Sequence, residues 1–360
     1  MNLAELIDTK SVIVCCGSGG VGKTTTAAVL AIEAARAGRR AVVVTIDPAR
    51  RLADALGLEG LTNEPAVIDG DWPGELAALM LDTEGTFNGL VTKYAGSPEQ
   101  AERILSNRFY KNIAGAMSGT QEYMASEKLY ELHADSGFDL IVVDTPPTRN
   151  ALDFLEAPNR LARFLDHKLY RLVTAPTRGI VRVVNVAAQS FFRSVGKVVG
   201  GDVIADAIEF FAAFDGMEQG FKERARSVEQ LLAAEDTAFV LVASPRADTV
   251  AEAMFFADEL QKSKLAVRAL IINRVHPHPA DRDPVRDRER ANELAGTTLG
   301  RQFEALADLG QISAGEEAHL RLLTERIGPA PVVRVPYLTV EVHDLASLTL
   351  VGDILMGRTT

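Results

Sequence analysis

Residues 17–24 read GSGGVGKT, and this stretch constrains the chain more than any other. It matches two templates at once: G-x-x-x-x-G-K-[ST], which binds the phosphates of a nucleoside triphosphate, and G-x-G-x-x-G, which binds a dinucleotide. The buried apolar run SVIVCC (11–16) precedes it, and an apolar-rich helical pattern closed by Gly38 follows it. Under both templates the phosphates lie at a helix N-terminus, so the loop predicts a nucleotide site in an α/β fold.

The residues after the last glycine favour a triphosphate over NAD. Lys23 offers a counter-charge for the β- and γ-phosphates and Thr24 a Mg²⁺ ligand, and a dinucleotide fold needs neither at the helix start. Asp47, at the end of the second buried run, would also suit the ribose of NAD. Asp144 ends a further buried run and begins the sequence DTPPT. A hydrolase needs an aspartate at such a position for its magnesium, and a dehydrogenase does not explain it. We therefore predict a nucleoside triphosphate.

The base is predicted from a late strand end. GTPases usually carry N-K-x-D there, whereas this chain reads NRVH (273–276), with Asn273 but neither the lysine nor the aspartate. ATP is therefore favoured over GTP.

Buried β-branched runs alternate with helical segments along the chain. After residues 11–16 these runs are RAVVVTID (40–47), FDLIVVD (138–144), TAFVLVAS (237–244), LAVRALIIN (265–273) and APVVRVPYL (330–338). The alternation predicts a doubly wound α/β fold with a mostly parallel sheet, as in phosphate-loop NTPases, and ligands at the carboxyl ends of the strands. Residues 84–135 and 149–235 carry helical patterns without a convincing strand. We expect a single domain over 1–360, with a helical subdomain inserted from these two segments.

Composition and net charge limit the kinds of partner that we expect this chain to bind. With 47% apolar and 24% charged residues, the chain has the balance of a globular protein. Its net charge of −11 argues against non-specific binding to nucleic acid or to anionic membranes. The N-terminus MNLAELIDTK lacks a secretory pattern, and no apolar run approaches the ~20 residues that span a bilayer. Cys15 and Cys16 lie inside a buried run, where we expect small core residues. We expect a cytoplasmic protein without a nucleic-acid partner and with at most peripheral membrane contact.

At the level of motifs, the chain resembles the family of arsenite-transport and tail-anchored-protein-targeting ATPases, which have a deviant phosphate loop. The resemblance rests on GSGGVGKTTTA (17–27), TIDPARRLADALG (45–57), DTPPTRNALDFLEAP (144–158), IIN (271–273) and VPYLTVEV (335–342). It implies an ATP- and Mg²⁺-dependent ATPase. It also implies a dimer that sandwiches the nucleotide and helical subdomains that rearrange between open and closed states.

The resemblance also assigns roles by position. Lys23 contacts phosphate, Asp47 positions or deprotonates the attacking water, and Thr24 and Asp144 hold Mg²⁺, Asp144 through water. The nucleotide contacts are expected from Gly17, Ser18, Gly19, Gly20, Val21, Gly22, Lys23, Thr24 and Thr25 at the phosphates, and from Asn273, Pro336 and Tyr337 at the adenine. An alternative role for Asp47 is to cap the helix that follows it.

Three departures from the family pattern affect the expected activity. Ser18 stands where the family has a lysine that crosses the dimer to the partner's nucleotide. Arg149 and Asn150 replace the glycine and histidine of switch II, and there is no C-x-x-C for a dimer-clasping zinc. We therefore hypothesise that the chain binds ATP but hydrolyses it slowly alone. It would form either a homodimer or a heterodimer with a lysine-bearing paralogue.

The possible client site lies in the apolar stretch 179–221. Its phenylalanines Phe191, Phe192, Phe210, Phe211 and Phe214 either line a groove for an apolar client helix or form the core of a helical bundle; we favour the core. The main functional hypothesis is an ATP-dependent chaperone or targeting factor for hydrophobic clients. The alternatives are the soluble ATPase subunit of an anion or metalloid efflux system, which the absence of further cysteines weakens, and a weakly catalytic regulatory scaffold.

Overall fold

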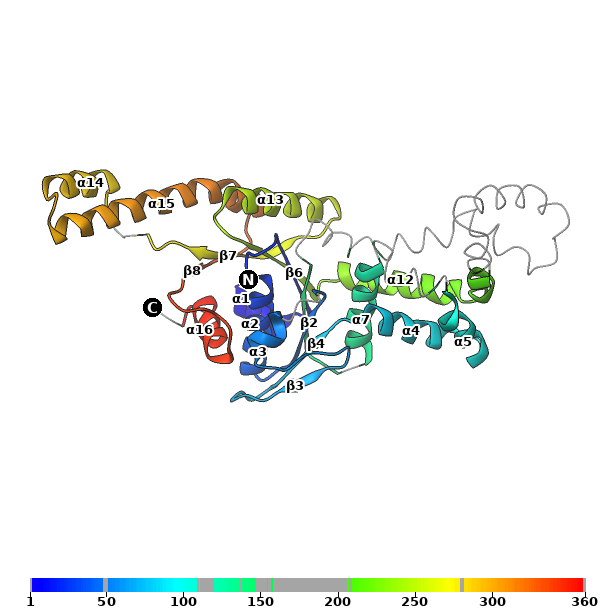
Figure 1. The fold of residues 1–360 in the computed structure, drawn as a ribbon. Helices are drawn as coiled ribbons and strands as arrows, with labels where there is room; N and C mark the ends of the chain where they lie inside the picture. Colours follow the sequence, from blue (N-terminus) through cyan, green and yellow to red (C-terminus); the bar gives the residue numbers. More distant parts are fainter. Residues whose placement is uncertain are drawn as a thin grey trace. The chain divides into compact units, whose positions relative to one another are not determined.

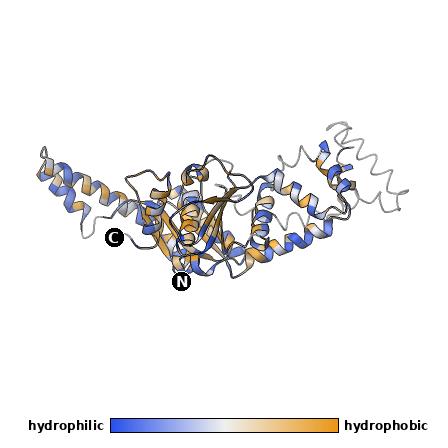
Figure 2. Cartoon of the chain, turned by 90° about the horizontal axis from the view of Figure 1, so that it is seen from below, coloured by the Kyte–Doolittle hydropathy of each residue, from blue (hydrophilic) through white to orange (hydrophobic). Residues whose placement is uncertain are grey.

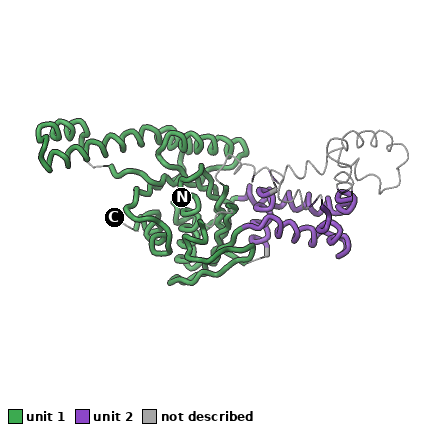
Figure 3. Tube along the Cα trace, in the orientation of Figure 1, with its two compact units in different colours: residues 1–80, 137–152, 235–360 green, residues 81–136, 153–234 purple. Residues whose placement is uncertain are grey.

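The computed structural model describes residues 2–47, 51–108, 110, 120–135, 137–146, 154, 157, 206, 209–278 and 282–358. The chain divides into two compact units (Figure 3). Unit 1 comprises residues 1–80, 137–152 and 235–360, and unit 2 comprises residues 81–136 and 153–234. That unit 2 works as an inserted helical subdomain stays a prediction.

The described part of unit 1 contains an eight-stranded sheet in the order β3-β4-β2-β5-β1-β6-β7-β8 (Figure 1). The strands are β1 (Val12–Cys16), β2 (Arg40–Thr45), β3 (Ala66–Ile68), β4 (Glu75–Met80), β5 (Leu140–Asp144), β6 (Thr237–Ala243), β7 (Val267–Val275) and β8 (Val332–Pro336). Every pairing is parallel except that of β3 with β4. The predicted α/β fold class is confirmed, and each of the six predicted runs contains a strand.

Continuous burial explains why these runs form central strands. All five residues of β1 are buried, and β1 lies between β5, where Val14 pairs with Val143, and β6, where Val14 pairs with Phe239. Cys15 and Cys16 are buried free thiols, as expected of core residues. A strand covered on both faces needs apolar side chains at every position, which is the pattern that the sequence showed. Figure 2 shows the hydrophobic colouring concentrated on the sheet.

Two strands were not predicted. β4, with the sequence ELAALM, pairs in parallel with β2, and the short β3 closes that edge of the sheet in antiparallel fashion. Glu, Leu, Ala and Met all favour helices, so local propensity points away from the observed structure. Pairing with β2 and burial of Leu76 through Leu79 decide the conformation instead.

Helices cover both faces of the sheet in unit 1. They are α1 (Leu3–Thr9), α2 (Lys23–Arg36), α3 (Arg51–Leu56), α13 (Ala247–Lys262), α14 (Pro284–Glu293), α15 (Thr298–Ile327) and α16 (Leu345–Leu355). α1, α2, α3 and α16 share one core with alternate strand residues such as Ile13 and Val43. α13 and α15 contact β6 and β7 and cover the other face (Figure 1).

α14 lies in a stretch rich in both acidic and basic residues. Asp283 caps α14 and Pro284 begins it, while the buried Asp287 pairs with Arg282. α14 packs against α15, a helix of 30 residues that was not predicted.

Unit 2 is helical in its described part. Its helices include α4 (Thr83–Tyr94), α5 (Pro98–Ser106), α7 (Thr120–Asp135) and α12 (Glu218–Ala233). Phe210 and Phe214 are buried in its core beside Phe221, and Phe211 packs at the edge of that core, which agrees with the core interpretation. Phe191 and Phe192 lie outside the described residues. No helix among the residues described is long and apolar enough to cross a membrane.

Candidate nucleotide-binding site

The phosphate loop connects the carboxyl end of β1 to the first residue of α2. Gly22 is the N-cap of α2 and provides no side-chain cap, so the N–H groups at the helix start are left to a ligand or to water. Gly19 and Gly20 are exposed, whereas Val21 is buried and anchors the loop. A helix N-terminus with free N–H groups at the carboxyl edge of a parallel sheet is suited to bind phosphate.

Two glycines of the loop are required by close packing. A Cβ on Gly17 would lie 2.1 Å from the carbonyl oxygen of Val242 on β6. A Cβ on Gly22, which has φ +98°, would lie 2.3 Å from Nδ2 of Asn273. The loop therefore fits closely against the ends of β6 and β7, and its path is fixed by the absence of side chains at these positions.

Lys23 is held inside the loop. Its Nζ donates to the carbonyl oxygen of Ser18 at 2.8 Å, and the side chain is almost completely buried. Burial lowers the pKa of Lys23, while the negative charge of Asp144 is the largest influence opposing that shift. The ammonium group is thus poised at the loop, where it can exchange one backbone oxygen for phosphate oxygens.

Asp144 is the centre of the site. Its Oδ2 accepts hydrogen bonds from the hydroxyls of Thr24 at 2.7 Å and Thr45 at 3.1 Å. Its Oδ1 is buried and has no hydrogen-bond partner among the described residues. β5 supplies the carboxylate, β2 supplies Thr45 and α2 supplies Thr24, so three elements meet at one side chain.

Burial dominates the electrostatics of this carboxyl group. It raises the pKa of Asp144 from 3.8 to about 6, although the hydrogen bond from Thr24 and the charge of Lys23 act in the opposite direction. An unpaired buried oxygen on an ionisable group costs free energy. A bound cation would satisfy this oxygen.

The donor atoms of the site match the needs of Mg²⁺ and a triphosphate. Mg²⁺ prefers oxygen ligands and usually takes one or two from the protein, the rest from water and phosphate. The Thr24 hydroxyl and the open Oδ1 of Asp144 meet that description, and Lys23 and the loop N–H groups meet the needs of phosphate oxygens. The residues present fit both groups.

Asp47 lies two residues beyond the end of β2. Its side chain is 20% exposed, and its Oδ2 lies 3.8 Å from a guanidinium nitrogen of Arg51 at the start of α3. The negative charge of Asp47 contributes in a small way to raising the pKa of Lys23 and of Asp144. This position suits a role near a bound phosphate. Thr25, the last predicted phosphate-loop residue, is half-buried in the first turn of α2.

Ser18 points into the protein. It is buried, and its Oγ has no hydrogen-bond partner among the described residues. Its carbonyl oxygen accepts a hydrogen bond from Nζ of Lys23. A short side chain in this position presents no cation outside the loop.

The three predicted adenine contacts lie at the ends of two adjacent strands, β7 and β8. Asn273 lies near the end of β7, Pro336 ends β8, and Tyr337 follows it with 61% of its surface exposed. The Nδ2 of Asn273 donates to the carbonyl oxygen of Val21 at 2.9 Å. Asn273 therefore ties β7 to the phosphate loop in this structure, a role that the sequence did not suggest.

Arg149 and Asn150 of the switch II motif lie outside the described residues. His276 and His278 bond to Glu316 and Ser313 of α15. No group of three or more metal-ligating side chains occurs among the residues that the structure describes.

Two functional threonines were missed. Thr45 donates to Asp144, and Thr145 donates to the carbonyl oxygen of Cys15 at 2.7 Å, which links β5 to β1 at the loop. Both are buried polar residues at the carboxyl ends of apolar strands. Their position at the end of an apolar run was the one feature of the sequence that could have pointed to them.

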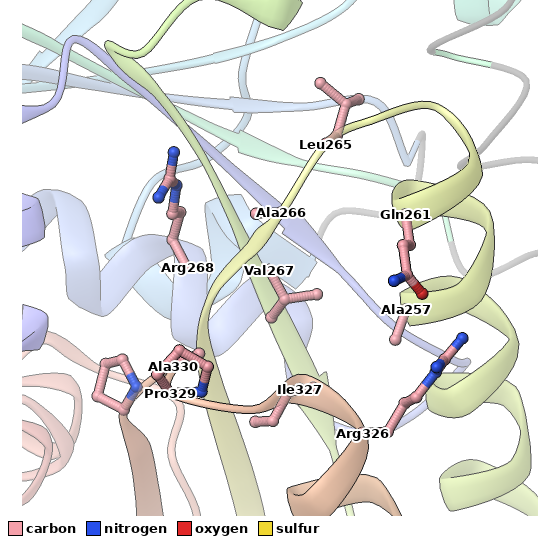
Figure 4. Close-up of a pocket in the computed structure, with 11 residues that line it drawn as sticks. Ala257, Gln261, Leu265, Ala266, Val267, Arg268, Arg326, Ile327, Pro329 and Ala330 are labelled. Atoms are coloured by element: carbon pink, nitrogen blue, oxygen red, sulfur yellow. The ribbon is translucent and has the colours of Figure 1, made fainter.

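A separate cavity of about 390 Å³ lies at the other end of β7 (Figure 4). It is lined by residues at the start of β7, by α13 and by the end of α15, including Val267, Ala257 and Ile327. Since ligands of doubly wound sheets bind at the carboxyl ends of the strands, this cavity is not the nucleotide site.

A phosphate loop between β1 and α2, with a buried carboxylate at the end of the neighbouring β5, defines a phosphate-loop NTPase. The sequence model of the anion-transporting ATPases matches residues 10–357, and the chain belongs to that family. Its activity is ATP hydrolysis, as predicted.

Curated relatives carry related names. An ATPase GET3 of Malassezia globosa is 27% identical over 287 residues, which cover 77% of each chain. An ATPase GET3 of Phaeosphaeria nodorum is 25% identical over 277 residues, which cover 76% of this chain and 79% of the relative. A shorter match, to the ATPase GET3 of Paracoccidioides lutzii, is 31% identical over 175 residues and covers 48% of this chain and 50% of the relative.

Proposed function

We propose that this chain binds ATP with Mg²⁺ at the phosphate loop and works in the cytoplasm as a dimeric, nucleotide-gated chaperone or targeting factor for hydrophobic protein clients. The proposal of ATP and Mg²⁺ binding rests on the side chain of Asp144. Its Oδ2 accepts hydrogen bonds from Thr24 and Thr45, and its Oδ1 is buried without a hydrogen-bond partner among the described residues. The client part rests on the motif resemblance and on the relatives named ATPase GET3.

Each site residue has a proposed part in the reaction. Lys23 holds the β- and γ-phosphates, Thr24 and Asp144 hold the metal, and Asp47 orients the attacking water. Bound Mg²⁺ would neutralise charge on the phosphoryl group that is transferred. Phosphoryl transfer depends mostly on positioning and charge neutralisation, so a single well-placed carboxylate is sufficient for the role of Asp47.

Ser18 sets the expected rate. A cation supplied from a partner subunit contributes ~10³–10⁵ to the rate in related phosphoryl-transfer enzymes. The buried, neutral Ser18 side chain cannot provide one. We therefore propose slow turnover in a homodimer of this chain, and faster turnover in a heterodimer whose partner carries lysine at this position.

Steady-state ATP hydrolysis by the purified chain tests this proposal. Ser18→Lys is expected to raise the rate, and Ser263→Lys, which changes an exposed serine at the end of α13, is the matched control. A fast wild-type rate that Ser18→Lys leaves unchanged would contradict the proposed role of Ser18.

Client binding needs a separate test. A synthetic 20-residue Leu- and Ala-rich helix, labelled with a fluorophore, is expected to bind in one nucleotide state and to be released in another. Equal binding with and without ATP would contradict nucleotide gating.

The description of the matched family as anion-transporting ATPases favours a second candidate, the ATPase subunit of an anion or metalloid efflux system. Arsenite binds thiols, and the only two cysteines of the chain, Cys15 and Cys16, are buried in β1. Burial raises the pKa of Cys16 to about 12, so its thiolate is scarce at neutral pH. Stimulation of ATP hydrolysis by arsenite would support this second candidate over the first.

A further inference from the structure

The base-side edge of the candidate site contains an aromatic pair. His276 follows β7 directly, and its ring stacks on that of Tyr337 with the centroids 5.6 Å apart and the planes 20° from parallel. The backbone supports the pair, because the N–H of Tyr337 donates to the carbonyl oxygen of Val275 at 2.8 Å. His276 therefore packs against the Tyr337 ring, while 61% of the surface of Tyr337 stays exposed.

Glu316 of α15 fixes the orientation of His276. Its Oε2 accepts from the backbone N–H of His276 at 2.9 Å, and its Oε1 lies 2.6 Å from Nδ1 of the same residue. Because a carboxylate only accepts hydrogen bonds, Nδ1 is the donor in this contact. Two bonds from one carboxylate hold both the backbone and the ring, so the imidazole plane cannot turn freely.

Residues 313–319 of α15 contact several residues at this edge of the sheet. Besides Glu316, Ser313 bonds to His278 at 3.0 Å, and His319 bonds to the carbonyl oxygen of Pro245, which follows β6, at 3.1 Å. Glu317 forms an ion pair with Arg334 of β8 at 3.0 Å. One stretch of α15 therefore contacts residues of three adjacent strand ends.

We propose that His276, oriented by Glu316, is a positioning residue for the nucleotide base. It backs the ring of Tyr337 and so makes that ring a rigid platform on which the purine stacks. Base–aromatic stacking is a substantial and geometry-dependent source of affinity. The proposal rests on the proposed ATP site and extends it to α15, which neither the motifs nor the family match assigns to nucleotide binding.

Calorimetric titrations with two probes separate the base from the phosphates. Mg²⁺·ATP reports on both, and Mg²⁺·tripolyphosphate reports on the phosphate loop alone. His276→Ala is expected to weaken ATP binding about three- to tenfold, as loss of an aromatic pair does, and to leave tripolyphosphate binding unchanged. His276→Phe, which keeps a stacking ring, is expected to restore ATP affinity to within about twofold.

His133→Ala is the control, since it removes an exposed histidine of α7, which has no part in the proposed base site. It should bind both probes as the wild type does. Glu316→Gln should weaken ATP binding less than His276→Ala and again spare tripolyphosphate, because the ring remains but is less firmly oriented.

The proposal is overturned if His276→Ala binds ATP like the wild type, or if it weakens both probes equally. It is also overturned if the wild type binds tripolyphosphate as tightly as ATP, because the base would then contribute nothing. Failure of the wild type to bind either probe is a different result: it removes the proposed phosphate site itself, and with it the premise of this inference.

Discussion

The hydroxyl of Thr24 lies 2.7 Å from Oδ2 of Asp144, so the first turn of α2 and the end of β5 meet at one carboxylate. Thr45 of β2 bonds to the same oxygen. The opposite oxygen, Oδ1, has no hydrogen-bond partner among the described residues. A charge that is buried, half satisfied and adjacent to a phosphate loop is the arrangement that a bound Mg²⁺ would complete.

The first prediction concerns pH and the stability of the ligand-free protein. Because the folded-state pKa of Asp144 is raised from 3.8 to about 6, the native state holds this proton more tightly than the unfolded state does. The stabilisation from Asp144 is therefore complete below pH 3.8 and is lost as the pH rises through about 6. The loss amounts to at most ~3 kcal/mol.

Urea unfolding in EDTA at pH 4.5 and pH 7 checks this prediction. Asp144→Asn cannot ionise, so the difference in unfolding free energy between the variant and the wild type should shift in favour of the variant at pH 7. Other carboxylates titrate in both proteins and cancel in this comparison. A difference that is the same at both pH values would contradict the prediction.

The second prediction concerns the fit of the phosphate loop. Gly22→Ala is expected to abolish tight ATP binding, because the added Cβ would lie 2.3 Å from Nδ2 of Asn273. Gly216→Ala is the matched control: Gly216, outside the phosphate loop, also has positive φ, but nothing lies within 4 Å of its Cβ position. The control should lose only ~1–2 kcal/mol of stability from backbone strain. ATP affinities that fall equally in both variants would show that the contact with Asn273 is unimportant.

The sequence predicted the central strands well because their burial is continuous. β1, β2 and β5 are fully apolar between their ends, and a short apolar run of this kind beside a phosphate loop is typical of a buried parallel strand. β4 was missed because ELAALM has helical propensity and becomes a strand only through pairing with β2. α15 was missed because its buried face contains small residues such as Ala307, Gly310 and Ser313, which give little periodic signal.

The site was predictable where a motif fixes the spacing. Lys23, Thr24 and Asp144 lie together as the motifs suggested. Thr45 was missed because its role depends on β2 and β5 being neighbours with Thr45 paired to Asp144, a register that no local pattern shows. The bond from Asn273 to Val21 likewise joins residues 252 positions apart, and only the fold brings them together.

The third prediction concerns Ser18. Its hydroxyl is buried and has no partner among the described residues, so Ser18→Ala should leave the unfolding free energy unchanged or raise it by up to ~1 kcal/mol. Ser97→Ala is the comparison, because the Ser97 hydroxyl has a partner: it caps α5 by accepting a hydrogen bond from the N–H of Gln100. Its loss should lower the unfolding free energy by ~1 kcal/mol. Thermal melting of both variants checks this. A cost for Ser18→Ala as large as that for Ser97→Ala would indicate a hidden partner for the Ser18 hydroxyl.

The fourth prediction concerns the helix that carries the phosphate loop. Glu33 of α2 is buried between two cations, with Arg36 at 2.8 Å and Arg358 at 2.5 Å, and both arginines also pair with Asp353 of α16. Replacing both arginines by methionine leaves the Glu33 carboxylate buried without a cation, which should cost ~3–5 kcal/mol.

Each single substitution should cost much less, because one cation remains beside Glu33. Arg246→Met, which breaks an exposed pair with Asp248, is the control and should stay within ~0.5 kcal/mol of the wild type. Urea unfolding of all four variants measures these differences. A double variant no less stable than the control would contradict the proposed role of the pair.

The central claim is that Asp144 and Thr24 hold a metal that binds together with ATP. Its most direct test is calorimetric titration of ATP into the wild type and Asp144→Asn, each with Mg²⁺ and with EDTA. We predict that Mg²⁺ strengthens ATP binding to the wild type by at least about tenfold, or ~1.4 kcal/mol, and has little effect on Asp144→Asn, which lacks the carboxylate that would hold the metal. An equal gain from Mg²⁺ in both proteins would contradict the claim.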